Sequence, residues 1–163
     1  MAYGEDVRGV GGWLAFFLVT LGIISPAVTI FYTVTSFGDP EAAYLPPDLF
    51  RTLSTIDIAS TVVVVALCLF AAWRLLRVFN WNSVRIAVAT LWLIALTNVL
   101  VIPLLVSGAV GLPLSMVFEA GGPQTIFRPL GYATIWTAYL LISKRVRNTY
   151  GRQSDGETAE VFA

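Results

Sequence analysis

Residues 55–77, TIDIASTVVVVALCLFAAWRLLR, join a long apolar run to a basic end. A membrane-spanning helix needs about 20 mainly apolar residues to cross a hydrocarbon core of about 30 Å. The run Thr55–Trp73 meets this length, and Arg74 and Arg77 follow directly after it. The stretch therefore predicts a transmembrane helix whose basic end lies at the cytoplasmic membrane border.

Three further apolar runs of comparable length occur on either side, at Trp13–Phe37, Ile86–Val106 and Gln124–Ser143. The fourth run, Gln124–Ser143, reaches the required length only marginally. With 163 residues, 57% hydrophobic and 12% charged, the chain is too apolar for an ordinary soluble domain and too short for two membrane bundles. We predict an all-α, four-helix transmembrane bundle over residues 1–152, with spans at about 13–37, 55–79, 84–106 and 124–147, and a disordered tail at 153–163.

Basic residues gather on one side of this arrangement. When the spans alternate in direction, eight of the ten lysines and arginines share a side, and only Arg51 and Arg128 lie opposite. By the positive-inside rule, both termini are predicted to be cytoplasmic. The cytoplasmic basic border is formed by the residues at the ends of the second, third and fourth spans, namely Arg74, Arg77, Arg85, Lys144, Arg145 and Arg147.

Several site types are excluded by residues that the chain lacks. It has no histidine, which excludes histidine-ligated haem, histidine-containing triads and histidine-rich metal sites. Its single cysteine, Cys68, cannot form an internal disulfide, a zinc site or an iron–sulfur cluster. We therefore expect no catalytic residue, no metal, no cofactor and no enzymatic activity. No basic arm or helix lies outside the membrane borders, so we expect no nucleic-acid partner.

Three polar residues fall within the predicted spans and form a candidate intramembrane polar site: Asp57, Asn98 and Arg128. Charges inside a bilayer are costly and are functional candidates by default. Asp57 and Arg128 lie at similar predicted depth, which favours an ion pair between the second and fourth spans. The alternatives are separate contacts of each side chain with nearby water, or a role in handling protons or ions. Asn98 is a candidate for interhelical hydrogen bonding or for binding a substrate.

The connections carry helix-stop and helix-start signals. Pro46, Pro47 and Asp48 are expected to keep the first external loop non-helical, and Ser83 is a candidate N-cap for the third span. Pro103 is expected to bend or end that span. The second external connection, Ser107–Pro123, keeps enough apolar residues for a short amphipathic segment in the interface.

The two ends of the chain resemble a known family. The motif Gly9-Val10-Gly11-Gly12-Trp13-Leu14 opens the first span, which contains Pro26. Ile135-Trp136 and Tyr139 precede the closing motif Ser143-Lys144-Arg145-Val146-Arg147-Asn148-Thr149-Tyr150. Together they are similar to the DUF2569 family of small four-helix bacterial inner-membrane proteins. The resemblance implies a multi-pass protein of the bacterial cytoplasmic membrane without an assigned activity.

Two functions remain open at this level. The first is a non-enzymatic accessory or assembly subunit that acts by association in the membrane, and its partners would be the lipid bilayer and a membrane protein or further copies of this chain. The alternative is a small oligomeric transporter, channel or ion-coupled sensor that uses Asp57, Asn98 and Arg128. A membrane enzyme acting on lipids would need converging acid, base or metal ligands, and the sequence offers few candidates.

Overall fold

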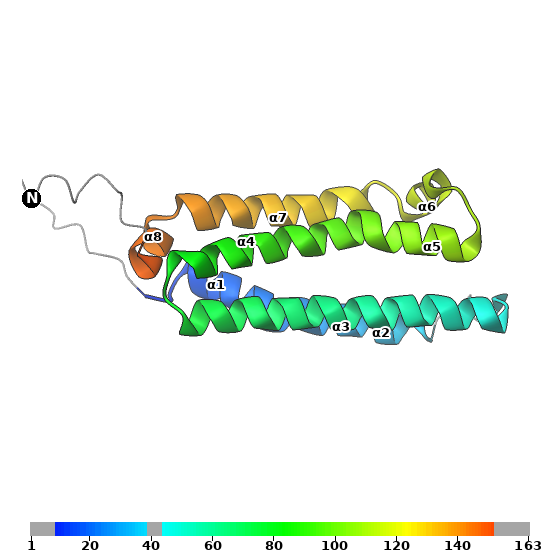
Figure 1. Ribbon diagram of the computed structural model, residues 1–163, viewed down its shortest axis with the longest axis horizontal. Coiled ribbons are helices and arrows are strands. Elements are labelled where there is room, and N and C mark those ends of the chain that lie inside the picture. The colour runs from blue at the N-terminus through cyan, green and yellow to red at the C-terminus, as the bar shows by residue number, and fades with distance from the viewer. Residues whose placement is uncertain (1–8, 39–43, 152–163) are drawn as a thin grey trace, which may run out of the picture.

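A computed structural model describes residues 9–38 and 44–151, and every regular element within them is a helix. The predicted all-α class is thus confirmed for these residues. Three of the helices are long and apolar enough to cross a membrane, namely Trp13–Ser36, Pro47–Arg77 and Trp81–Val110. The predicted disordered tail at 153–163 lies outside the described residues. Figure 1 shows the long helices running side by side along the molecule.

The first long helix contains a wide turn ahead of its proline. It consists of α1 (Trp13–Val19), a π-helical turn η1 (Thr20–Ile24) and α2 (Ser25–Ser36). Pro26 lacks a backbone N–H and its ring crowds the preceding turn. The π-helical turn widens the helix at that point, and the backbone N–H of Ser25 bonds to the Thr20 carbonyl, five residues back. The helix therefore continues past Pro26.

The second long helix, α3 (Pro47–Arg77), begins eight residues before the predicted start at residue 55. Pro47 occupies the first helical turn, where a missing N–H costs nothing and the fixed φ of proline is favourable. Asp48 lies in the same turn, near the positive end of the helix dipole. The sequence reading treated these residues as a helix stop, whereas they start the helix that follows them. With 31 residues and a rise of about 1.5 Å each, α3 exceeds the length that a bilayer requires.

The third long helix also passes through its proline. It consists of α4 (Trp81–Leu96), a second π-helical turn η3 (Thr97–Val101) and α5 (Ile102–Val110). Pro103 follows η3 just as Pro26 follows η1, so the helix does not end there. The predicted N-cap was wrong: the cap is Asn80, whose Oδ1 accepts a hydrogen bond from the Ser83 backbone N–H at 3.1 Å.

Replacing Asn80 by alanine should lower the free energy of unfolding by about 1 kcal/mol, because the first turn of α4 loses its side-chain acceptor. The measurement is the unfolding of purified protein in detergent. Asn82→Ala is the matched control, since the side chain of Asn82 is exposed and forms no hydrogen bond with a described residue. Equal losses in the two variants would contradict the capping role of Asn80.

The last part of the chain folds back over one end of the molecule. After a short helix α6 (Leu114–Gly121), α7 (Gln124–Ile142) returns along α4. The predicted fourth span, 124–147, is interrupted at Ser143, which has an extended backbone conformation and caps α8 (Lys144–Tyr150). A helix seven residues long therefore lies beyond the break, across the end of the bundle where α4 begins (Figure 1).

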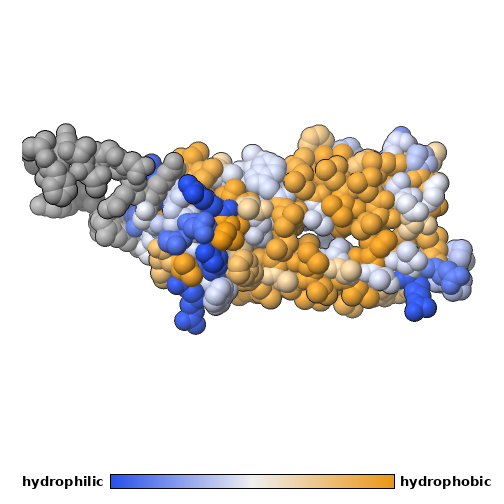
Figure 2. Space-filling model, in the orientation of Figure 1, coloured by the Kyte–Doolittle hydropathy of each residue, from blue (hydrophilic) through white to orange (hydrophobic). Residues whose placement is uncertain are grey.

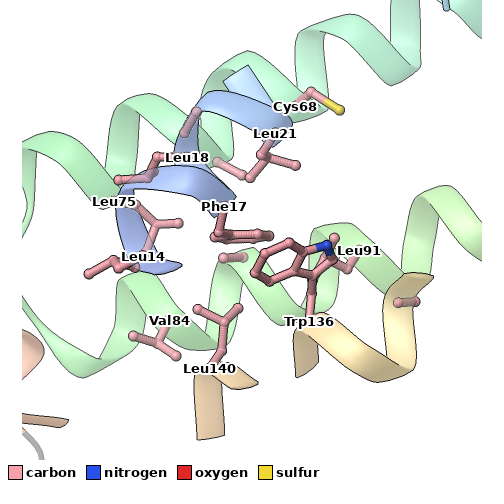
Figure 3. Packing of buried hydrophobic residues seen from close by; sticks show 14 of the residues in the cluster. Leu14, Phe17, Leu18, Leu21, Cys68, Leu75, Val84, Leu91, Trp136 and Leu140 are labelled. Carbon is pink, nitrogen blue, oxygen red and sulfur yellow. The ribbon is translucent and has the colours of Figure 1, made fainter. Parts of the chain in front are cut away.

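Packing is concentrated at this end. The buried cluster joins α1 and η1 to α3, α4, α7 and α8, and Figure 3 shows Phe17 facing Trp136 at its centre. Close approach of the first helix to α3 depends on Gly22, because a Cβ there would lie 3.0 Å from the Cβ of Ala72. At the opposite end, α5 and α6 contain no buried residue. The molecule is closed and dense at one end and open at the other.

The surface has the pattern of a membrane-embedded chain. Figure 2 shows an orange, hydrophobic band along the middle of the molecule, with blue, hydrophilic atoms gathered toward both ends. Large apolar side chains project from this band, including Phe31, which is 64% exposed. The dense end carries the basic border that the sequence predicted.

Candidate functional site

A wide, open hollow lies in the open half of the molecule, between η3 and the start of α7. Its volume is about 530 Å³, and it is lined by Asn98, Gln124, Thr125, Arg128 and Pro129. We call it the polar hollow after its four polar residues, which are all exposed, although more of its lining surface is apolar than polar. Two of the three predicted intramembrane polar residues, Asn98 and Arg128, therefore face the same hollow from different helices.

Asn98 reaches the hollow from the π-helical turn that precedes Pro103. Its Nδ2 donates a hydrogen bond to the Ile94 carbonyl at 2.8 Å, within the same helix. This leaves the Oδ1 acceptor and one N–H donor of the amide without an assigned partner. π-helical turns are frequent at functional sites because they displace side chains from the regular helical register. The turn places this amide beside α7, which packs against η3.

Arg128 lies one turn into α7, close to the open end. Within residues 9–38 and 44–151, its guanidinium has no hydrogen-bonding or ion-pair partner. The side-chain amide of Gln124, one turn earlier on the same side of the helix, likewise forms no hydrogen bond with another described residue. Thr125 donates its hydroxyl hydrogen to the Gly122 carbonyl at 2.7 Å, so its oxygen remains an acceptor. The hollow thus contains one cation, two amides and one hydroxyl.

The predicted ion pair between Asp57 and Arg128 is not formed. Asp57 instead accepts a hydrogen bond from the Ser36 hydroxyl at 3.1 Å, which links α3 to α2. About one helical turn further from the open end, the hydroxyls of Thr33 and Thr61 bond to one another across the same two helices. The two charges project toward different neighbours. Asp57 belongs to the α2–α3 contact, and Arg128 belongs to the hollow beside η3.

The contact between α4 and α7 is fixed by a polar bond as well as by packing. Trp92 Nε1 donates to the Thr137 hydroxyl at 3.1 Å. In an apolar membrane region, such interhelical hydrogen bonds favour one relative rotation of the two helices. Asn98 and Arg128 lie further along the same two long helices and line the hollow between them.

At the dense end, the two chain motifs meet in an end clasp, formed by Gly9–Gly12, Arg145, Thr149 and Tyr150. The Gly9 backbone N–H donates to the Thr149 hydroxyl at 3.0 Å. A Cβ at Gly11 would collide with the Arg145 guanidinium, so a glycine permits this close approach. Tyr150 is buried, and its hydroxyl donates to the Leu75 carbonyl at 2.7 Å. The motifs are therefore explained by contact between the beginning and the end of the described chain.

The basic border surrounds this clasp. Figure 2 shows its hydrophilic atoms grouped at the end that carries α8. Arg145 packs on the glycines of the clasp, while Arg77, Arg85 and Arg147 are exposed. Such a cluster suits the anionic headgroups of a membrane surface. Among the residues that the structure describes, no group of three or more histidine, cysteine, aspartate or glutamate side chains is placed to hold a metal ion.

Comparison with known proteins gives one match. A family model described as "Protein of unknown function (DUF2569)" matches residues 7–151. The match includes both motifs of the end clasp and all residues of the polar hollow. No curated protein and no solved structure matches the chain.

Proposed function

The chain belongs to the DUF2569 family, and from this premise we propose that it is a four-span protein of the bacterial inner membrane with both termini in the cytoplasm. Three helices have the length and hydropathy for spanning. The basic residues in the last turn of α3 and in α8 lie at the same end of the molecule, which supports the proposed orientation.

The helix α7 is the proposed fourth span. Its 19 residues extend about 28 Å, which is close to the thickness of the hydrocarbon core. Its lower hydropathy is compatible with spanning because it packs against α4 and its charge, Arg128, lies near one end. A long side chain at that depth can reach the membrane border.

Labelling of introduced cysteines tests the topology. Tyr44, which is 89% exposed near the start of α3, is proposed to lie outside the cell, and Asn82, in the first turn of α4, in the cytoplasm. In intact cells, an impermeant maleimide should modify Tyr44→Cys and spare Asn82→Cys. Cys68 is only 2% exposed, so the unmodified chain serves as the background control. Labelling of Asn82→Cys but not Tyr44→Cys would reverse the topology.

For activity, we propose a non-enzymatic accessory or assembly subunit that acts by association within the membrane. The observation that carries this proposal is the difference in packing between the two halves. Side chains are packed closely at the dense end. In the third long helix, by contrast, only 11% of the residues in its 18-residue apolar stretch are buried, against 28% in the corresponding stretches of the other two apolar helices. The described extramembrane helices α6 and α8 are short, which supports association over catalysis.

Site-specific photocrosslinking in native membranes tests this association. A photoreactive residue at Leu100, which is 46% exposed on the third helix, should give a protein adduct of one defined mass. The matched control is Val62, 62% exposed on α3, which should give much less of that adduct. Equal yields at the two positions, or adducts with lipid alone, would contradict an association surface on the third helix.

The alternative is a small oligomeric transporter, channel or ion-coupled sensor, and the polar hollow beside η3 is the observation that favours it. Four spans enclose too little volume for a polar path in one chain, so this alternative requires a homo-oligomer. Native mass spectrometry in detergent separates the two. A heteromeric complex supports the accessory role, and a symmetric homo-oligomer supports the alternative.

A further inference from the structure

We infer that the polar hollow between η3 and α7 binds the phosphate headgroup of a membrane phospholipid, with Arg128 as its principal ligand. This is a binding site in addition to the association surface, and it does not depend on the accessory role. It is distinct from the basic border, which lies at the opposite end of the long helices.

The side chains of the hollow match a phosphodiester. A guanidinium has five N–H donors in a planar fork and binds two phosphate oxygens at once. Within residues 9–38 and 44–151, no carboxylate forms an ion pair with Arg128, and Asp57 is bonded to Ser36 on the α2 side of the molecule. The amides of Asn98 and Gln124 add N–H donors around the same space. An anion in the hollow would accept hydrogen bonds from these exposed groups.

Depth and surroundings favour a lipid over a dissolved anion. Arg128 lies four residues after the start of α7, which is about 6 Å below that end. This is near the border between headgroups and acyl chains. On the side of the hollow that faces the middle of the long helices, Leu93 and Leu96 of α4 are about half exposed. A phosphate in the hollow would place acyl chains along this apolar surface, whereas a free anion would gain nothing from it.

The test measures lipid retention by the full chain. Protein purified in detergent is mixed with phosphatidylglycerol, and native mass spectrometry measures the lipid-bound fraction during titration. Arg128→Gln should weaken binding at least about tenfold, because a charged, bidentate hydrogen-bonding group is lost. Asn98→Leu keeps the cation and should weaken binding by a smaller factor. Arg51→Gln is the matched control, because Arg51 is an exposed arginine near the start of α3, at the same end.

The outcomes are distinct. Selective loss in Arg128→Gln, with Arg51→Gln unchanged, supports the site. Unchanged retention in Arg128→Gln, or equal loss in Arg51→Gln, overturns it. Displacement of the lipid by millimolar inorganic phosphate would show that the hollow takes a free anion and would overturn the lipid assignment. If Arg128→Gln is not monodisperse, the single variants Arg128→Lys and Asn98→Leu are each compared with the unmodified chain. Lipid retention equal to that of the unmodified chain in both variants would overturn the site.

Discussion

Replacing Tyr150 by alanine should lower the free energy of unfolding by about 3 kcal/mol, the lower end of the range for removing a buried aromatic side chain. Tyr150 is 1% exposed, stacks on Phe79 with ring centroids 5.9 Å apart, and donates a hydrogen bond to the Leu75 carbonyl. It therefore attaches α8 both to the end of α3 and to the residues that follow it. Thermal unfolding in detergent measures the loss.

Two variants separate packing from hydrogen bonding. Tyr150→Phe keeps the ring and should lose only about 1 kcal/mol. Tyr44→Ala is the control, because that side chain is 89% exposed and its removal should leave stability nearly unchanged. In Tyr150→Ala, trypsin should also cleave faster at Lys144, Arg145 and Arg147 as α8 detaches. Unchanged stability and cleavage in Tyr150→Ala would refute the structural role of the end clasp.

Alkaline pH should weaken the clasp in the same way. Burial, together with a smaller effect of the nearby Tyr139, raises the pKa of Tyr150 to about 12, whereas an unfolded tyrosine titrates near 10. Between pH 10 and 12 the unfolded chain releases this proton first, so stability is lost as pH rises through that window. Below pH 10 this contribution is fully present. In Tyr150→Phe the component should disappear, and an identical pH profile for both proteins would contradict it.

The sequence was sufficient for properties that depend on position along a helix axis. Run length and hydropathy located the apolar helices, and the basic residues beside Trp73 and after Ile142 marked one end of the molecule. None of these inferences required knowing which side of a helix faces its neighbour.

Rotation about the helix axis could not be predicted, and there the expectations failed. A membrane helix is apolar on all sides, so periodicity does not indicate which face is packed. Asp57 bonds to Ser36, Trp92 bonds to Thr137, and Arg128 lines a hollow together with Asn98. The π-helical turns ahead of Pro26 and Pro103 shift the register again. A proline within an apolar run is a partial signal for such a turn, since each π-helical turn ends two residues before a proline.

The break before α8 has a signal in the sequence. Ser143 is a good N-cap residue, and it stands directly between the apolar residues of α7 and the basic residues of α8. This pattern indicates a break and a new helix, and therefore a chance for the last segment to turn back. The contact with Gly9–Gly12 depends on tertiary structure and could not be read from spacing.

Replacing Phe17 by alanine should have a similarly large effect, a loss of about 3 kcal/mol, because it opens the centre of the dense end. Phe17 is completely buried, and its ring centroid lies 4.7 Å from that of Trp136 (Figure 3). This pair joins the first long helix to α7, and Phe16 adds a second, more distant ring contact to Trp136, with ring centroids 6.0 Å apart. In a membrane, where lipid is as apolar as the core, such close packing supplies much of the association between helices.

A double-mutant cycle tests whether the pair acts as a unit. Trp136→Ala should also destabilise the protein, and the double variant should lose about 1 kcal/mol less than the sum of the single losses, because the ring contact is removed only once. Phe31→Ala is the matched control, since Phe31 lies in the same long helix but is 64% exposed, and it should be nearly neutral alone and additive with Trp136→Ala. Strict additivity for Phe17 and Trp136, or a loss in Phe31→Ala as large as in Phe17→Ala, would show that this contact does not close the dense end. The cycle therefore measures directly whether α1 and α7 are held together by these two rings or only through the helices between them.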